Sequence, residues 1–154
     1  DGIDTIGLYD ARAALVYLRD SNTAGSADTT FRFGPTGSDW QAIAGDWNGD
    51  GIDTIGLYDA RAGLFYLHNS NRPGSADTTF RFGPTGSEWQ AIVGDWNGDG
   101  IDTIGLFDAQ SATLYLRDSL TSGPAEYPDG DGLVLATGEL TLLGQHGLAW
   151  ESIA

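Results

Sequence analysis

The chain repeats itself with a period of 49 residues, and this constrains its fold more than any other feature. Residues 50–98 reproduce residues 1–49 with only eight differences, and a third, more divergent copy begins at Asp99. Self-similarity at this period is typical of repeat arrays and β-propellers, in which one small structural unit recurs. We therefore treat residues 1–154 as a single repeat domain with repeats at 1–49, 50–98 and 99–154.

Each copy contains four short apolar segments separated by turn-forming residues. In the second copy they lie at residues 54–58, 64–67, 78–82 and 89–93. These segments are rich in β-branched and aromatic residues, which favour strands. Phe80 and Phe82 alternate with Arg81, as in a strand with one buried face. Four strands are the content of one propeller blade, so we predict an all-β fold of three four-stranded β-propeller blades.

The third copy carries an insertion. Asp1 lies 39 residues before Trp40, whereas Asp99 lies 51 residues before Trp150, so twelve extra residues fall within 119–139. Both chain ends align with positions inside a strand–loop–strand unit, which indicates circularly permuted blades. Each repeat then supplies three strands to one blade and the first strand to the next. Because propellers close with about four to eight blades, we expect completion by oligomerisation or by further blades of a longer chain.

The composition excludes several classes of function. The formal net charge of −15 opposes binding to nucleic acid, whose phosphates would be repelled, and suits binding to cations. Cys and Met are both absent, so the chain has no thiolate metal site and no catalytic cysteine. No segment approaches the roughly 18 apolar residues that a membrane span requires.

Two loops, residues 46–54 and 95–103, share the sequence DWNGDGIDT. Asp and Asn alternate in this sequence, and its Gly residues permit a tight curl of the backbone that makes the side-chain oxygens converge. Hard divalent cations such as Ca²⁺ bind about six to eight oxygens. We predict that the Asp and Asn side chains and one Ile carbonyl per loop bind a metal: Asp46, Asn48, Asp50 and Ile52, and Asp95, Asn97, Asp99 and Ile101.

The repeats resemble a known family. FRFGPTG, at 31–37 and 80–86, is followed by W-x-x-I-x-GDWNGDG, and this combination resembles the FG-GAP/VCBS repeats of secreted bacterial proteins and the calcium loops of the integrin α-subunit propeller. GLYDARAGLFYLHNSN at 56–71 is similar to the remainder of those repeats. The resemblance covers the chain except for the insertion. It implies one blade per repeat, Ca²⁺ in each loop, and a secreted or cell-surface location.

The loops depart from the family pattern at one position. The ninth loop residue is usually Asp in the family but is Thr54 or Thr103 here. Each Thr could still contribute its hydroxyl or carbonyl oxygen, or hold a bridging water. Asp53 and Asp102 lie one residue earlier, where we expect the side chain to point away. The alternative is a metal-free Asx-type turn, in which Asp and Asn bind the amides of the loop.

Other residues allow two interpretations. The recurring Trp40, Trp89 and Trp150, and Tyr17, Tyr66 and Tyr115, suit packing within or between blades but could also stack on sugar rings. The inserted PDGDG at 128–132 is either a turn or a cation site. His68 and His146 are not equivalent, and we identify no nucleophile near them, so we do not expect an enzyme.

These patterns predict a non-catalytic, calcium-binding extracellular β-propeller module for scaffolding, adhesion or assembly. The alternative is a carbohydrate-binding propeller lectin. The expected partners are further copies or blades, and glycans or extracellular proteins.

Overall fold

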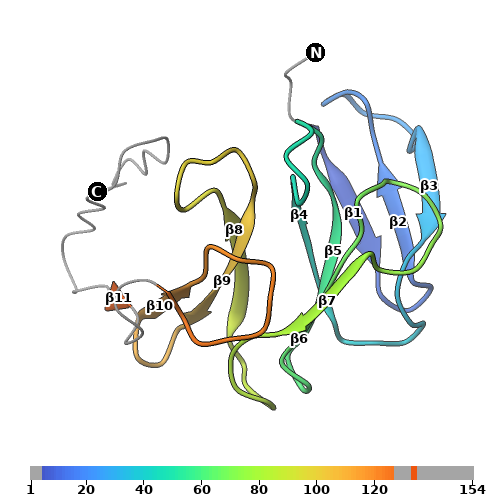
Figure 1. Cartoon of the computed structure of the whole chain (residues 1–154). Coiled ribbons are helices and arrows are strands. Elements are labelled where there is room, and N and C mark those ends of the chain that lie inside the picture. Colours follow the sequence, from blue (N-terminus) through green and yellow to red (C-terminus); the bar gives the residue numbers. More distant parts are fainter. Residues whose placement is uncertain (1–4, 127–132, 135–154) are drawn as a thin grey trace, which may run out of the picture.

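The computed structural model describes residues 5–126 and 133–134, which form three antiparallel sheets (Figure 1). The first sheet has the order β1-β2-β3, with β1 at Gly7–Asp10, β2 at Leu15–Leu18 and β3 at Thr29–Arg32. The second has the order β4-β5-β6-β7, with Gln41–Gly45, Thr54–Asp59, Leu64–Leu67 and Thr78–Arg81. The third has the order β8-β9-β10-β11, with Gln90–Gly94, Thr103–Asp108, Thr113–Leu116 and Leu133–Val134.

The predicted all-β class is confirmed, and the described residues include no helix. Each apolar segment predicted in the second copy overlaps a strand, with bounds that differ by at most one residue: β5, β6, β7 and β8. The fourth of these strands, β8, pairs with β9 of the next repeat, with Gly94 opposite Thr103. The strands of one repeat are therefore divided between two successive sheets, in the permuted order that the sequence predicts.

The apolar core lies between successive sheets. One cluster joins Val16 and Phe31 of the first sheet to Ile55 and Leu57 of the second. A larger cluster joins the second sheet to the third, and Phe65, at its centre, stacks on Phe80 and on Tyr58. The alternation predicted for the fourth segment is confirmed, since Phe80 and Phe82 are buried and Arg81 is exposed. The apolar side chains of successive sheets are thus buried against one another.

Strands β4 and β8, the first strands of their sheets, lie next to each other. The Gln41 side chain joins them, because its amide nitrogen donates to the Ala91 carbonyl at 3.0 Å and its oxygen accepts from the Ala91 amide at 2.9 Å. Ala91 lies one repeat beyond Ala42, so this contact joins neighbouring units in a head-to-tail sense.

The loop at 117–126 in the third repeat follows the same path as its counterparts in the first two. The Glu126 amide donates to the Leu116 carbonyl at 2.8 Å, as Asp77 and Asp28 donate to Leu67 and Leu18. Residues 117–126 therefore carry no extra length relative to the other copies. PDGDG at 128–132, His146 and Trp150 lie outside the described residues.

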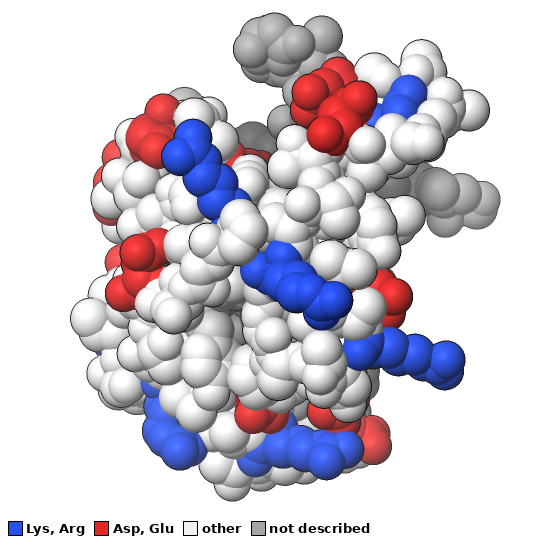
Figure 2. All heavy atoms as spheres, turned by 90° about the vertical axis from the view of Figure 1, so that its right-hand side faces the viewer, with Lys and Arg blue, Asp and Glu red and all other residues white. Residues whose placement is uncertain are grey.

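The surface carries scattered positive charge. All seven basic residues are Arg. On the face shown in Figure 2, these side chains form separate groups, several of them beside acidic side chains. That face therefore presents no continuous basic surface. The described residues also contain no helix long and apolar enough to cross a membrane.

Candidate metal-binding loops

The two DWNGDG loops connect the first strand to the second in two sheets, β4 to β5 and β8 to β9. In the first loop, Asp46 Oδ1 accepts the amides of Gly49 at 2.8 Å and Asp50 at 3.0 Å, while its Oδ2 accepts the amide of Gly51 at 2.7 Å. Asp95 accepts the three equivalent amides at 2.8, 3.0 and 2.8 Å. The two loops therefore have the same hydrogen-bonded geometry.

The predicted side-chain ligands come together within each loop. In the first, Asn48 Nδ2 donates to Asp50 Oδ2 at 3.0 Å, and Asn48 Oδ1 accepts the Asp50 amide at 3.1 Å. Gly49 and Gly51 permit this curl with φ of 74° and 82°. Asn97 and Asp99 repeat the side-chain contact at 3.0 Å. The alternation of Asp and Asn thus places three oxygen-bearing side chains in one turn.

These hydrogen bonds are those of an Asx-type turn, and they are also compatible with a bound cation. A carboxylate offers about four lone-pair sites. Asp46 accepts three loop amides, and the Asn48 amide acts on it as well, so a cation would share the carboxylate oxygens with these donors.

The ninth-position threonines lie in the strands with some of their polar groups already engaged. The Thr103 hydroxyl donates to the Gly94 carbonyl of β8 at 3.3 Å. The Thr54 carbonyl accepts the Trp47 indole N–H at 3.2 Å. Both threonines are buried. The side chains at positions one, three and five are engaged as well, with loop amides and with each other.

Both first-position carboxylates are held in the charged form. Burial acts to raise the pKa of Asp46, but the amides of Gly51, Asp50 and Gly49 outweigh it, and the pKa lies below its ordinary value. The pKa of Asp95 is lowered chiefly by the Gly100 amide. Both groups are therefore anionic at neutral pH, as a cation ligand must be.

Asp102 has a role that sequence reasoning missed. Its Oδ2 accepts the Asp46 amide at 2.9 Å, and its own amide donates to the Asp46 carbonyl at 2.8 Å. The eighth-position aspartate of the second loop therefore binds the backbone of the first loop. This contact accompanies a difference between the loops: Asp46 is 9% exposed, whereas Asp95 is open to solvent. The recurrence of Asp at position eight was the available sequence signal.

Asp118 is a second residue that sequence reasoning missed. Its Oδ1 is buried without a hydrogen-bond partner. Its pKa is raised by burial and then by the negative charges of Glu126, Asp99 and Asp95. Asp118 thus lies in the negative field of the second loop, and a cation bound there would favour its charged form.

The loops would need neutral donors to complete a metal site. Nowhere in residues 5–126 or 133–134 do three or more acidic, histidine or cysteine side chains form a group that could hold a metal ion. A cation in either loop would therefore rely on Asn48 or Asn97 and on backbone carbonyls in addition to the carboxylates. Such mixed oxygen sets are typical of calcium sites.

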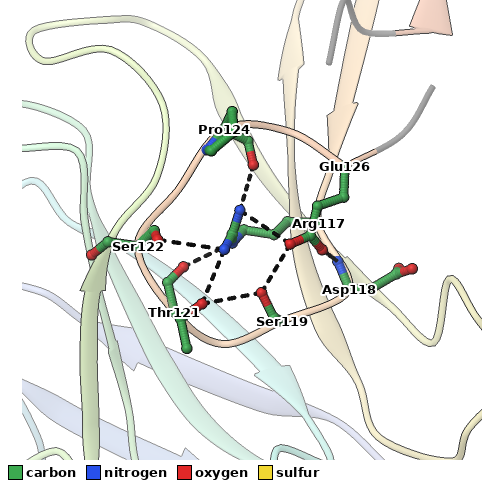
Figure 3. Close-up of polar contacts among 7 residues, drawn as sticks. All are labelled: Arg117, Asp118, Ser119, Thr121, Ser122, Pro124 and Glu126. Carbon is green, nitrogen blue, oxygen red and sulfur yellow. Dashed lines mark hydrogen bonds and ion pairs between the residues drawn. The ribbon is translucent and has the colours of Figure 1, made fainter. Parts of the chain in front are cut away.

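A buried arginine organises the neighbouring loop of the third sheet (Figure 3). The Arg117 guanidinium donates to the carbonyls of Thr121 at 2.8 Å, Ser122 at 3.4 Å and Pro124, and it forms an ion pair with Glu126 at 3.3 Å. Arg19 makes the equivalent contacts in the first repeat. The guanidinium donors of both arginines are occupied by backbone carbonyls, so we assign these residues a structural role.

His68 replaces this arginine in the second repeat. Its Nδ1 lies 2.7 Å from Asp77 Oδ2, its Nε2 lies 3.2 Å from Ser70 Oγ, and its ring stacks on Phe33. The structure thus brings the Ser70 hydroxyl next to His68, where the sequence identified no nucleophile. Asp77 also accepts the Asn69 amide at 2.7 Å, as Asp28 and Glu126 do in the other repeats. Because the same loop is built around Arg elsewhere, we interpret His68 as its structural replacement.

The recurring aromatic residues pack in pairs. Trp40 stacks on Tyr66 and Trp89 on Tyr115, each pair with ring centroids 4.6 Å apart. One face of each Trp ring is therefore covered by packing on a Tyr ring. A hollow of about 280 Å³ beside Trp40 and Tyr66 opens between the first and second sheets, with Phe33 and Pro35 in its wall.

No protein-family model matches this chain, and comparisons with curated proteins and with solved structures find no match either.

Proposed function

We propose that this protein is a non-catalytic, calcium-binding β-propeller module of the FG-GAP/VCBS type, secreted or displayed at a cell surface for scaffolding, adhesion or assembly. The observation that carries the proposal is the duplicated loop, in which Asp46 and Asp95 accept the same three amides at matching distances. In each loop this turn also brings an Asn and a second Asp side chain beside the first carboxylate, and such a group of oxygens supports a common cation ligand.

The propeller architecture is supported by how the sheets meet. Propeller blades are four-stranded sheets arranged around a central channel. Here the cores lie between successive sheets, and the first strands β4 and β8 adjoin through Gln41. Equivalent core residues recur at the two contacts between sheets: Val16 and Phe31 pack with Ile55 and Leu57, as Phe65 and Phe80 do with Ile104 and Leu106. A head-to-tail relation that repeats between units is the relation that builds a ring.

The residues of each loop fit calcium. Asp46, Asn48 and Asp50 would hold the ion in the first loop with the Ile52 carbonyl, and Asp95, Asn97, Asp99 and Ile101 in the second. The lowered pKa values of Asp46 and Asp95 keep the first ligand charged. The unpartnered Asp118 oxygen lies in the negative field of the second loop. Bound Ca²⁺ would offset the negative charges of the aspartates and so stabilise the loop.

Calcium titration with a calorimeter tests the proposal. We expect binding in the range of extracellular modules, roughly 10⁻⁴–10⁻³ M. At a dissociation constant of about 1 mM, 10 mM Ca²⁺ should stabilise the fold by about 1.4 kcal/mol per site. The double variant Asp46→Asn/Asp95→Asn should lose this effect, and Asp59→Asn, in a hairpin outside the loops, should keep it. Absence of both binding heat and stabilisation at 10 mM would refute the proposal.

A lectin is the second candidate, and the hollow beside Trp40 and Tyr66 favours it. Sugar rings stack on aromatic faces, and repeated pockets gain avidity. A glycan array with Trp40→Ala as control separates the two functions. Sugar-dependent binding that the variant loses would support the lectin, and a scaffold should show none.

A further inference from the structure

The two candidate calcium loops are in direct contact through residue 102. Asp102, at position eight of the second loop, accepts the backbone amide of Asp46 on its Oδ2 at 2.9 Å. Its own amide donates to the Asp46 carbonyl at 2.8 Å. Asp46 is position one of the first loop, and its carboxylate organises that loop. One residue of the second loop therefore holds both backbone polar groups of the central residue of the first.

A packing contact lies beside these hydrogen bonds. A Cβ atom added at Gly49 would lie 3.1 Å from Ile101 Cγ1 and 3.7 Å from the Gly100 carbonyl oxygen. The backbone of the first loop therefore lies directly against the residues that precede Asp102. Gly49 itself, with φ of 74°, belongs to the curl of the first loop. The curl of one loop and the turn of the other cannot shift independently without losing this contact.

The contacts join residues that the proposed function assigns to cation binding. In the second loop, Asp99 and Ile101 are proposed ligands, and Asp102 follows them directly. Residues 99–101 would be restricted by a cation in that loop, and Asp102 would then be held against Asp46. Because coupling between binding sites is reciprocal, a cation in the first loop must favour binding in the second by the same factor.

We propose that Asp102 couples the two loops, so that a divalent cation bound in one loop raises the cation affinity of the other. The inference rests on the calcium binding of the proposed function, and it makes Asp102 a positioning residue rather than a ligand. Order supplied by the first cation need not be supplied by the second, which is a source of positive cooperativity. We expect a factor of about ten, which two backbone hydrogen bonds of ordinary strength can supply.

Repulsion between two bound cations acts in the opposite sense. The carboxylates of each loop reduce the charge that one occupied site presents to the other, and salt screens the remainder at exposed positions. The hydrogen bonds between Asp46 and Asp102, in contrast, lie at a buried residue, since Asp46 is almost inaccessible to water. We therefore expect the contact between the loops to outweigh the repulsion.

Calcium calorimetry on single-loop variants measures the coupling. Asp50→Ala disables the first loop and Asp99→Ala the second, so each variant reports the association constant of the loop that remains. The coupling factor is the overall association constant of the unchanged protein divided by the product of these two constants. We expect a factor of about ten. A factor of one would mean independent loops and a smaller factor dominant repulsion, and either would overturn the proposal.

Variants at position eight identify the residue responsible. Asp102→Ala, introduced into the same three proteins, should abolish the coupling. Asp102→Asn keeps an acceptor oxygen for the Asp46 amide and should retain it. The matched control Asp53→Ala removes the position-eight carboxylate of the first loop, leaves the contacts of Asp102 in place, and should also retain it. Coupling that survives Asp102→Ala, or that is lost equally in Asp53→Ala, would overturn the role of Asp102.

Amide hydrogen exchange provides a measurement at the contact itself. In Asp50→Ala, calcium can bind only in the second loop, yet it should slow exchange of the Asp46 amide, which donates to Asp102. An unchanged exchange rate with the second loop occupied would contradict the coupling. Absence of binding heat in every protein would refute calcium binding and the coupling together, whereas independent binding in both loops would refute the coupling alone.

Discussion

The two candidate calcium loops are an internal matched pair, and removing one charge from each should separate the effect of burial from that of local hydrogen bonding. Asp46 and Asp95 accept the same three amides. Asp46, however, is buried against the next repeat and bound to Asp102, whereas Asp95 is exposed. We predict that Asp46→Asn destabilises the fold more than Asp95→Asn.

The magnitude follows from the contacts of Asp46. Asn keeps one acceptor oxygen, which can retain the amides of Gly49 and Asp50, but its NH₂ group then faces the Gly51 amide, which now bonds to Oδ2 at 2.7 Å. The variant thus loses a charge-assisted hydrogen bond in a place that water reaches poorly. Such a bond contributes about 1.5–3 kcal/mol, so we expect a loss of about 2 kcal/mol. Water can replace the equivalent bond at Asp95, and its loss should be clearly smaller.

Urea unfolding at one fixed protein concentration, in the presence of EDTA, measures both losses without any contribution from metal. At typical slopes, a loss of about 2 kcal/mol lowers the urea midpoint by about 1 M. Equal losses in the two variants, or a larger loss at Asp95, would refute the argument that the next repeat makes the first loop the more sensitive one.

Three further predictions concern the same framework. Phe65→Ala, at a fully buried ring between Tyr58 and Phe80, should lower the free energy of unfolding by about 3–5 kcal/mol in urea. Asp102→Ala removes the acceptor for the Asp46 amide and should cost about 1–2 kcal/mol, while Asp102→Asn, which keeps an acceptor oxygen, should cost less by the same measurement. Because folding lowers the pKa of Asp46, its stabilising effect should be present above an unfolded-state pKa of about 3.9 and disappear as the pH falls through the folded value. Thermal unfolding from pH 7 to pH 3 should accordingly show a weaker pH dependence in Asp46→Asn than in the unchanged protein.

Local pattern was sufficient to predict the strands and the tight acidic turn. The period-two alternation around Arg81 exposes the Arg and buries Phe80 and Phe82, because a pleated strand sends successive side chains to opposite faces. The spacing of Asp46, Asn48 and Asp50 with intervening glycines likewise predicts a tight acidic turn, since both the turn geometry and its donors lie within a few residues.

The contacts between repeats could not be predicted in this way. Asp102 was expected to point away from its own loop, but its partner is the amide of Asp46, 56 residues earlier. His68 and Ser70 meet because the second repeat lacks the arginine that organises the same loop elsewhere. Asp118 follows β10, outside the second loop, yet the negative charges of Asp99 and Asp95 in that loop raise its pKa.

The sequence by itself thus determined the unit, its strands and the chemistry of its loops, because all three arise from neighbours along the chain. Only the tertiary structure decided which of two identical loops is buried. The physical reason is that burial depends on the adjoining unit, and nearly identical repeats carry no information about what adjoins them.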